Sequence, residues 1–139
     1  MMLQSWLTHA WLYPALEVVH ILGIALLLGN LATLEVRLWG GSAGLAIPPL
    51  ARLCIALALA GFTLAAASGL VMFALQTQEL LSNDRFVWKM GLLLLAGMNA
   101  AAFHARASLQ RLDVWARIQL VLSALLWLGV LVLGRWIAY

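Results

Sequence analysis

Two long apolar stretches of the sequence carry side chains that can bind a metal or move a proton. Glu17 and His20 lie in the first stretch, and Lys89 and His104 lie near the two ends of the second. An imidazole nitrogen ligates metals, while carboxylates and amines act as acids and bases. An ionisable group inside a lipid-spanning helix costs about 2.5 to 3.5 kcal/mol on insertion scales and usually faces the bundle interior. These four residues are therefore the candidates for chemistry.

Depth in the membrane separates the two histidines. A rise of about 1.5 Å per helical residue places His20 and His104 about 13 to 15 Å apart along the membrane normal, too far for opposite ligands of one metal. A haem held by a single histidine, or one site per histidine, remains open. The outer layer that contains His20 holds five side chains in all: Glu17, His20, Met72, Lys89 and Met90.

The residues around His20 suit a flat cofactor. Gly23 lies about one turn beyond His20 on the same face, where it removes a side chain beside the imidazole and makes room for a ring. Lys89, with Arg85 and Arg135, can neutralise propionates or another anionic head group at the outer surface. We therefore expect Gly23 and Arg135 to contact the cofactor, with Lys89 and Glu17 as the candidate catalytic groups.

Structural roles also account for the same side chains. A membrane histidine often hydrogen-bonds a neighbouring helix, and Glu17 with Lys89 can form a structural ion pair. Met72 and Met90 suit Cu(I), a soft ion, but methionine is also ordinary packing material. Copper held by His20, Met72 and Met90, with His104 as a further metal ligand, is the alternative to haem.

Composition places the whole chain in a membrane. Of its 139 residues, 65% are hydrophobic and 9% are charged, whereas soluble domains have about 25% charged residues. The mean hydropathy of +1.02 leaves room for little besides embedded helices and short connections. The eight basic residues are spread over loops and helix ends, which indicates membrane topology rather than nucleic-acid binding. We expect a single domain over residues 1–139.

The apolar runs predict an all-α, four-helix, up-down transmembrane bundle. The spans lie at about residues 11–34, 50–75, 86–104 and 118–136, since about 20 apolar residues cross a bilayer. Residues 1–10 are too few to span and are expected to form a short interfacial helix. Pro48 and Pro49 suit the first turn of the second helix, and Asn83 or Asp84 can cap the third. Small residues at helical spacing predict a packing face on the second span: Gly61, Ala65, Ser68 and Gly69.

Basic residues give the orientation. The connections after spans one and three, with the helix ends beside them, hold Arg37, Arg52, Arg106, Arg111 and Arg117. The opposite side holds Arg85, Lys89 and Arg135. Because positive residues favour the cytoplasm, both termini are expected outside, in a multi-pass protein of the inner (plasma) membrane.

The two stretches also resemble a known group of proteins. EVVHILGIALLLGNLATLEVRLW, from Glu17 to Trp39, resembles the first helix of HemJ-type protoporphyrinogen oxidases and of the copper-resistance protein D group. The stretch from Phe86 to His104, FVWKMGLLLLAGMNAAAFH, resembles a later helix of those proteins, in which a lysine lies at the start of the span. The chain looks like a small four-helix bacterial membrane protein near that group. The resemblance implies haem b bound through His20, with Lys89 needed for activity, or copper movement across the inner membrane.

These observations lead to one hypothesis and two alternatives. We expect a haem b-like cofactor between spans one and three, with His20 as axial ligand, Met72 or Met90 as a second ligand, and electron transfer with a membrane quinol. Such a protein would be a membrane oxidoreductase. The alternatives are copper or ion transport, and a cofactor-free accessory subunit. The lipid bilayer and a quinone are the expected partners, with a homo-oligomer or a larger membrane complex as the assembly.

Overall fold

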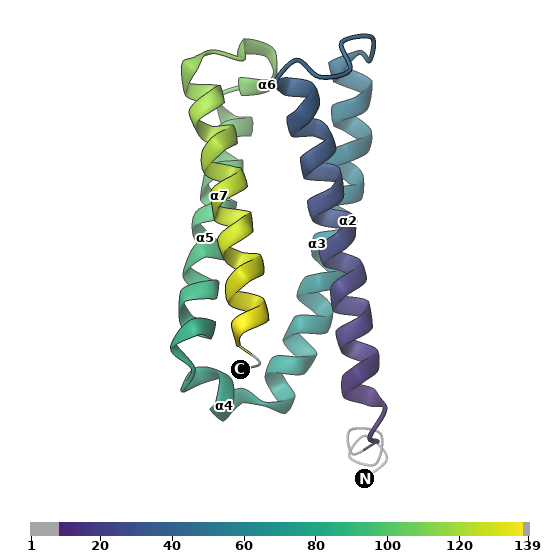
Figure 1. The fold of residues 1–139 in the computed structure, drawn as a ribbon, viewed down its shortest axis with the longest axis vertical. Helices are drawn as coiled ribbons and strands as arrows, with labels where there is room; N and C mark the ends of the chain where they lie inside the picture. The colour runs from purple at the N-terminus through teal and green to yellow at the C-terminus, as the bar shows by residue number, and fades with distance from the viewer. Residues whose placement is uncertain (1–8, 138–139) are drawn as a thin grey trace. The chain divides into compact units, whose positions relative to one another are not determined.

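Four long apolar helices dominate the computed structural model, which describes residues 9–137 (Figure 1). The described part consists of helices joined by short turns: α2 (Leu12–Leu38), α3 (Ile47–Leu75), α4 (Thr77–Leu81), α5 (Asp84–Ala105), α6 (Ser108–Arg111) and α7 (Val114–Trp136). The helices α2, α3, α5 and α7 are long and apolar enough to cross a membrane. The prediction of four long apolar helices is therefore confirmed, and these helices fit a multi-pass membrane protein in a lipid bilayer.

The helix ends differ from the predicted boundaries. The α2 helix continues past Glu35 to Leu38, and α7 begins at Val114, four residues before the predicted start. Apolar runs mark the part of a helix that lies in hydrocarbon, whereas charged residues in the interfacial turns keep helical backbone hydrogen bonds. The predicted connections at 76–85 and 105–117 accordingly contain the short helices α4 and α6. The interfacial helix predicted for residues 1–10 falls almost wholly outside the described residues.

Two capping side chains and a pair of prolines mark where three helices begin. The Asn83 side chain accepts a hydrogen bond from the backbone N–H of Arg85, which confirms Asn83 as the cap of α5. The Asp113 side chain accepts one from the N–H of Ala116 at 2.9 Å and caps α7. Proline occupies the first turn of α3, as predicted, where a missing N–H costs no helical bond.

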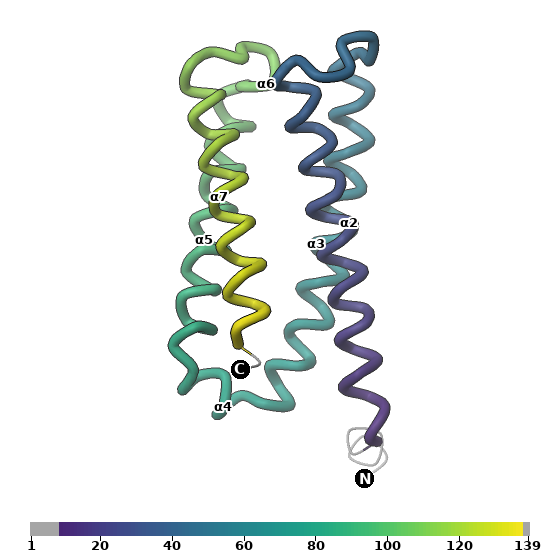
Figure 2. The backbone as a smooth tube through the Cα atoms, viewed as in Figure 1, coloured from purple at the N-terminus to yellow at the C-terminus, as the bar shows by residue number. Residues whose placement is uncertain are grey.

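The chain divides into two compact units, residues 1–77 and 78–139, and each is described by itself. In the first, α2 and α3 pack antiparallel as a hairpin, the α2–α3 hairpin, whose course Figure 2 traces. The open end of this hairpin is the end where α2 begins and α3 ends, and there the Tyr13 hydroxyl donates to Gln76 Oε1 at 3.1 Å. Small residues let the backbones meet: a Cβ on Gly61 would lie 2.6 Å from the carbonyl oxygen of Gly23. The predicted packing face on α3 is thereby confirmed.

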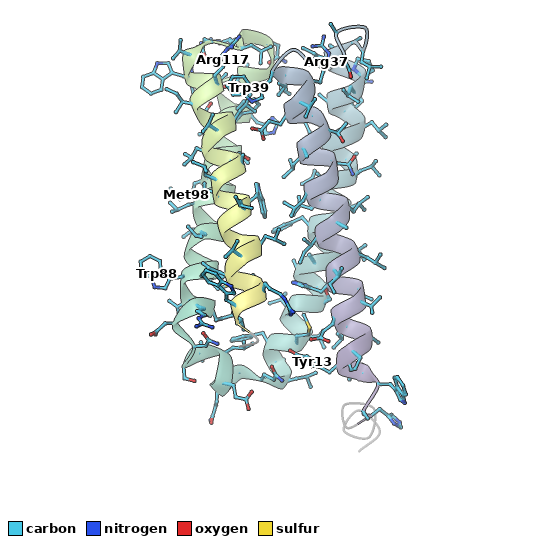
Figure 3. The ribbon with its side chains drawn as sticks, viewed as in Figure 1. Tyr13, Arg37, Trp39, Trp88, Met98 and Arg117 are labelled. Atoms are coloured by element: carbon cyan, nitrogen blue, oxygen red, sulfur yellow. The ribbon has the colours of Figure 1, made fainter. Side chains whose placement is uncertain are left out.

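In the second unit α5 and α7 form an antiparallel pair, the α5–α7 hairpin, connected through α6. Its buried residues on the two long helices are Ala96, Phe103, Ala116, Leu120, Leu126 and Val130. Trp88 and Met98 point away from α7 (Figure 3) and are 69% and 59% exposed. Such exposed apolar side chains fit a helix that lies in a lipid bilayer.

Candidate functional site

His20 lies half-buried on α2 with one edge of its ring against α3. Its Nδ1 is 2.8 Å from the carbonyl oxygen of Ala65 and 3.2 Å from Ser68 Oγ. A carbonyl oxygen only accepts hydrogen bonds, so the nitrogen that faces it carries the proton and donates. In a neutral imidazole the other nitrogen, Nε2, then holds the lone pair that can ligate a metal.

Ser68 is oriented by its own helix. Its hydroxyl donates to the carbonyl oxygen of Leu64 at 2.7 Å, and the side chain is buried, with 4% of its surface exposed. Two carbonyl oxygens of its own helix lie within reach of the hydroxyl, that of Leu64 at 2.7 Å and that of Ala65 at 3.2 Å, and with its proton on either one the oxygen has a lone pair for His20 Nδ1. The Nδ1–H group of His20 is thus shared between two acceptors, both on α3.

Two glycines set how closely α2 and α3 approach around His20. A Cβ on Gly69 would lie 3.2 Å from His20 Cε1 and 3.5 Å from Nδ1. Gly23 has a role different from the expected one: a Cβ there would lie 2.6 Å from the backbone nitrogen of Ala65. The space beside Gly23 is therefore filled by the backbone of α3, and it holds no room for a flat ring. The absence of a side chain at Gly23 serves helix packing.

Glu17 and Met72 lie at one level of the α2–α3 hairpin. Glu17 is one turn beyond His20 on α2 toward the open end, and Met72 is one turn beyond Ser68 on α3 in the same direction. Glu17 is exposed and Met72 is half-buried. Three of the five side chains expected in one outer layer, Glu17, His20 and Met72, belong to this hairpin, and the layer as a whole stays a prediction.

Basic side chains gather at the end of the α5–α7 hairpin where α7 ends. Arg85 Nη1 donates to the carbonyl oxygen of Trp136 at 2.6 Å, and Lys89 Nζ would lie 3.4 Å from a Cβ on Gly134. Arg135 is exposed in the last turn of α7. Cations at a helix C-terminus stabilise its unpaired carbonyls and its dipole. Lys89, Arg85 and Arg135 therefore lie at one end of this hairpin, as the sequence predicted.

The remaining predicted metal ligands lie on α5. Met90 is 39% exposed, and His104 is exposed in the last turn, with its ring edge-on to that of Phe103 at a centroid distance of 5.5 Å. Within residues 9–137 no group of three His, Cys, Asp or Glu side chains is placed to hold a metal ion. The proposals of Met90 and His104 as ligands, and of Lys89 beside a cofactor on His20, stay predictions because they join residues of separate units.

The sequence did not predict a polar cluster around α6. Arg106 pairs with Asp113 at 3.1 Å and donates to Gln119 Oε1 at 3.3 Å, while the Ser108 hydroxyl donates to the same oxygen at 3.1 Å. The backbone N–H of Ala116 lowers the pKa of the Asp113 carboxyl below its ordinary value, and Arg106 lowers it further. The one sequence signal for this cluster is Asp113, because an Asp just before an apolar run is typical of a helix cap.

Over residues 9–137 the fold and the site define a helical protein with four apolar helices of membrane-spanning length and a histidine, His20, held against a neighbouring helix. Comparison of the chain with protein-family models, with curated proteins and with solved structures finds no match.

Proposed function

We propose that this protein binds a haem b-like cofactor in the membrane, with His20 as an axial ligand through Nε2. One observation carries the proposal: the Nδ1–H of His20 is donated to the backbone carbonyl of Ala65 at 2.8 Å. Histidines that ligate metals almost always donate their other ring N–H to a carbonyl, a carboxylate or water. Such a bond fixes the ring and makes the ligating nitrogen a better donor.

A single oriented imidazole is a sufficient protein ligand for haem. The porphyrin supplies four nitrogens to the iron itself, and a single proximal histidine is enough in several haem proteins. Because the α2 and α3 backbones are in contact at Gly23 and Gly61, a porphyrin cannot lie between these two helices at that level. The cofactor would lie on an outer face of the α2–α3 hairpin, with Glu17 and Met72 one turn away.

The proposed activity is electron transfer between a membrane quinol and an acceptor. A bound haem supplies the one-electron step, and the protein tunes it through the axial ligand, burial and nearby charge. Lys89 and Arg135, at one end of the α5–α7 hairpin, are proposed to neutralise the carboxylates of the cofactor. The arrangement that this requires is the up-down bundle, with α2 facing α5 and both termini outside the inner membrane.

Absorption spectroscopy of the detergent-purified protein tests the proposal. We expect a Soret band that shifts on reduction with dithionite and is lost in the His20→Ala variant. His9→Ala is the matched control, since His9 is exposed just before α2, and it should keep the spectrum. A colourless wild-type protein that retains no hemin after incubation with it and removal of the unbound excess would refute haem binding, and an unchanged spectrum in His20→Ala would refute the ligand assignment.

A further inference from the structure

We infer that Gly69 and Ser68 are positioning residues that hold His20 in the Nδ1–H tautomer and so determine which nitrogen can ligate. The inference deepens the proposed function and rests on it for the consequence to cofactor binding. The statement about the ring itself is argued from contacts within the α2–α3 hairpin. Neither residue is expected to touch the cofactor.

The first step concerns the space for the ring. His20 Cε1 lies 3.2 Å from the place where a Cβ on Gly69 would be, and Nδ1 lies 3.5 Å from it. A contact of 3.2 Å is tighter than side-chain carbons normally make, so a methyl group at Gly69 would push the ring away from α3. The absence of a side chain at Gly69 thus lets the imidazole come close enough to reach the Ala65 carbonyl.

The second step concerns the proton. The carbonyl oxygen of Ala65 accepts from Nδ1, and Ser68 Oγ presents a second acceptor at 3.2 Å when its own proton goes to a carbonyl of its helix, that of Leu64 or Ala65. Reversing the tautomer would set the lone pair of Nδ1 against the carbonyl oxygen at 2.8 Å, which is repulsive, and would leave the Ser68 hydroxyl as the one of these two groups able to donate to Nδ1. Two acceptors on α3 therefore favour one tautomer, in which Nε2 carries the lone pair.

The third step is the consequence for a ligand on His20. A metal-bound imidazole that keeps its Nδ1–H bond to a carbonyl is a stronger donor and has a fixed orientation. Loss of such an outer contact costs about 10-fold to 100-fold in metal affinity. Gly69→Ala, which pushes the ring away from both acceptors by a few tenths of an ångström, should weaken haem binding by up to about tenfold, whereas Ser68→Ala, which leaves the Ala65 carbonyl in place, should weaken it less.

The test combines two readouts on the full chain in detergent micelles. ¹⁵N NMR of histidine-labelled protein without cofactor reports which ring nitrogen of His20 carries the proton, with His20→Ala to assign the signal. Hemin titration then gives the dissociation constant. Gly29→Ala is the control for Gly69→Ala, because a Cβ on Gly29 meets nothing within 4 Å. Thr63→Val is the control for Ser68→Ala, because Thr63 loses a similar bond, to Leu59 in its own helix.

We expect a protonated Nδ1 in the wild type, a smaller fraction of that tautomer in Gly69→Ala, a displaced Nδ1 signal in Ser68→Ala, and no change in either control. A protonated Nε2 in the wild type, or equal behaviour of Gly69→Ala and Gly29→Ala, would overturn the inference. If the wild type binds no hemin while the NMR results are as expected, the haem proposal fails and the positioning of His20 stands. If the tautomer changes and hemin affinity does not, the positioning role in the site is refuted.

Discussion

His20 Nδ1 and the backbone carbonyl of Ala65, 2.8 Å apart, join the two helices of the first hairpin through a side chain on one and the backbone on the other. The bond forms where glycines have already removed side chains between the helices, so close packing and hydrogen bonding depend on each other. Small residues drive helix association in lipid because they permit such approach. The same contact orients the residue on which the proposed function depends.

Enlarging Gly61 should separate α2 from α3. A Cβ on Gly61 would lie 2.6 Å from the backbone nitrogen of Leu27 and from the carbonyl oxygen of Gly23, and backbone cannot move aside as a flexible side chain can. Gly61→Ala should destabilise the fold by about 1 to 3 kcal/mol, the usual cost of overpacking. Unfolding with increasing SDS in mixed micelles measures it. Gly91→Ala on α5, where a Cβ meets nothing within 4 Å, should cause no loss, and equal stability of the two variants would contradict the packing.

Asn99 and Asn30, which lie in two of the long helices, should contribute differently to the stability of the fold. Asn99 Nδ2 donates to the carbonyl oxygen of Gln119 on α7 at 2.9 Å, whereas Asn30 Nδ2 donates to Leu26 in its own helix at 2.7 Å. Hydrogen bonds between membrane helices contribute about 0.6 kcal/mol on average and up to about 1.7. Asn99→Ala should therefore lower the free energy of unfolding by that amount and weaken the packing of the α5–α7 hairpin. The weaker packing would be detected as faster proteolytic cleavage or faster amide hydrogen exchange in α5. Asn30→Ala should leave the contacts between helices unchanged, and a larger effect from Asn30 would refute the assignment.

The sequence predicts the four apolar helices because lipid leaves a spanning chain few options: each backbone N–H and C=O must be satisfied within the helix. It also predicts that Gly61 to Gly69 pack against another helix. It does not say which helix, because small residues permit close approach by any neighbour. Gly23 shows the difficulty, since its spacing from His20 suited a cofactor equally well until α3 was seen to occupy the space.

The partner of His20 could not be predicted for a related reason. Ala65 binds it through a backbone carbonyl, which every residue has, so the side chain at that position carries no signal. The acceptor is identified only by the register of α2 against α3. Ser68 was predicted for its small size, and its hydroxyl became part of the site only when the same register placed it 3.2 Å from Nδ1.

Acid should weaken the α6 region through Asp113. The carboxylate accepts the Ala116 N–H and pairs with Arg106, and its pKa in the folded protein lies below the ordinary value of 3.8. A lowered pKa means that the ionised form is favoured by folding, so the stabilisation is present above pH 3.8 and is lost as pH falls through the lower folded value. The pH dependence of the unfolding free energy measures it. Asp113→Asn, which keeps a cap acceptor and removes the charge, should lose that dependence; an unchanged slope would exclude Asp113 as its source.

Glycine should be tolerated best where the backbone before α6 is left-handed. Ala107 is exposed and has φ of 52°, a conformation that costs an L-residue about 1 to 2 kcal/mol. Ala107→Gly removes that strain but adds about 0.4 to 1 kcal/mol of backbone entropy to the unfolded chain, so the net effect should be a small stabilisation. Ala100→Gly, at an exposed position within α5, should instead destabilise by about 1 kcal/mol. The two variants should change the free energy of unfolding in opposite directions in the same SDS unfolding assay, because the two alanines differ mainly in φ. An equal loss of unfolding free energy in both variants would show that the turn before α6 is not left-handed.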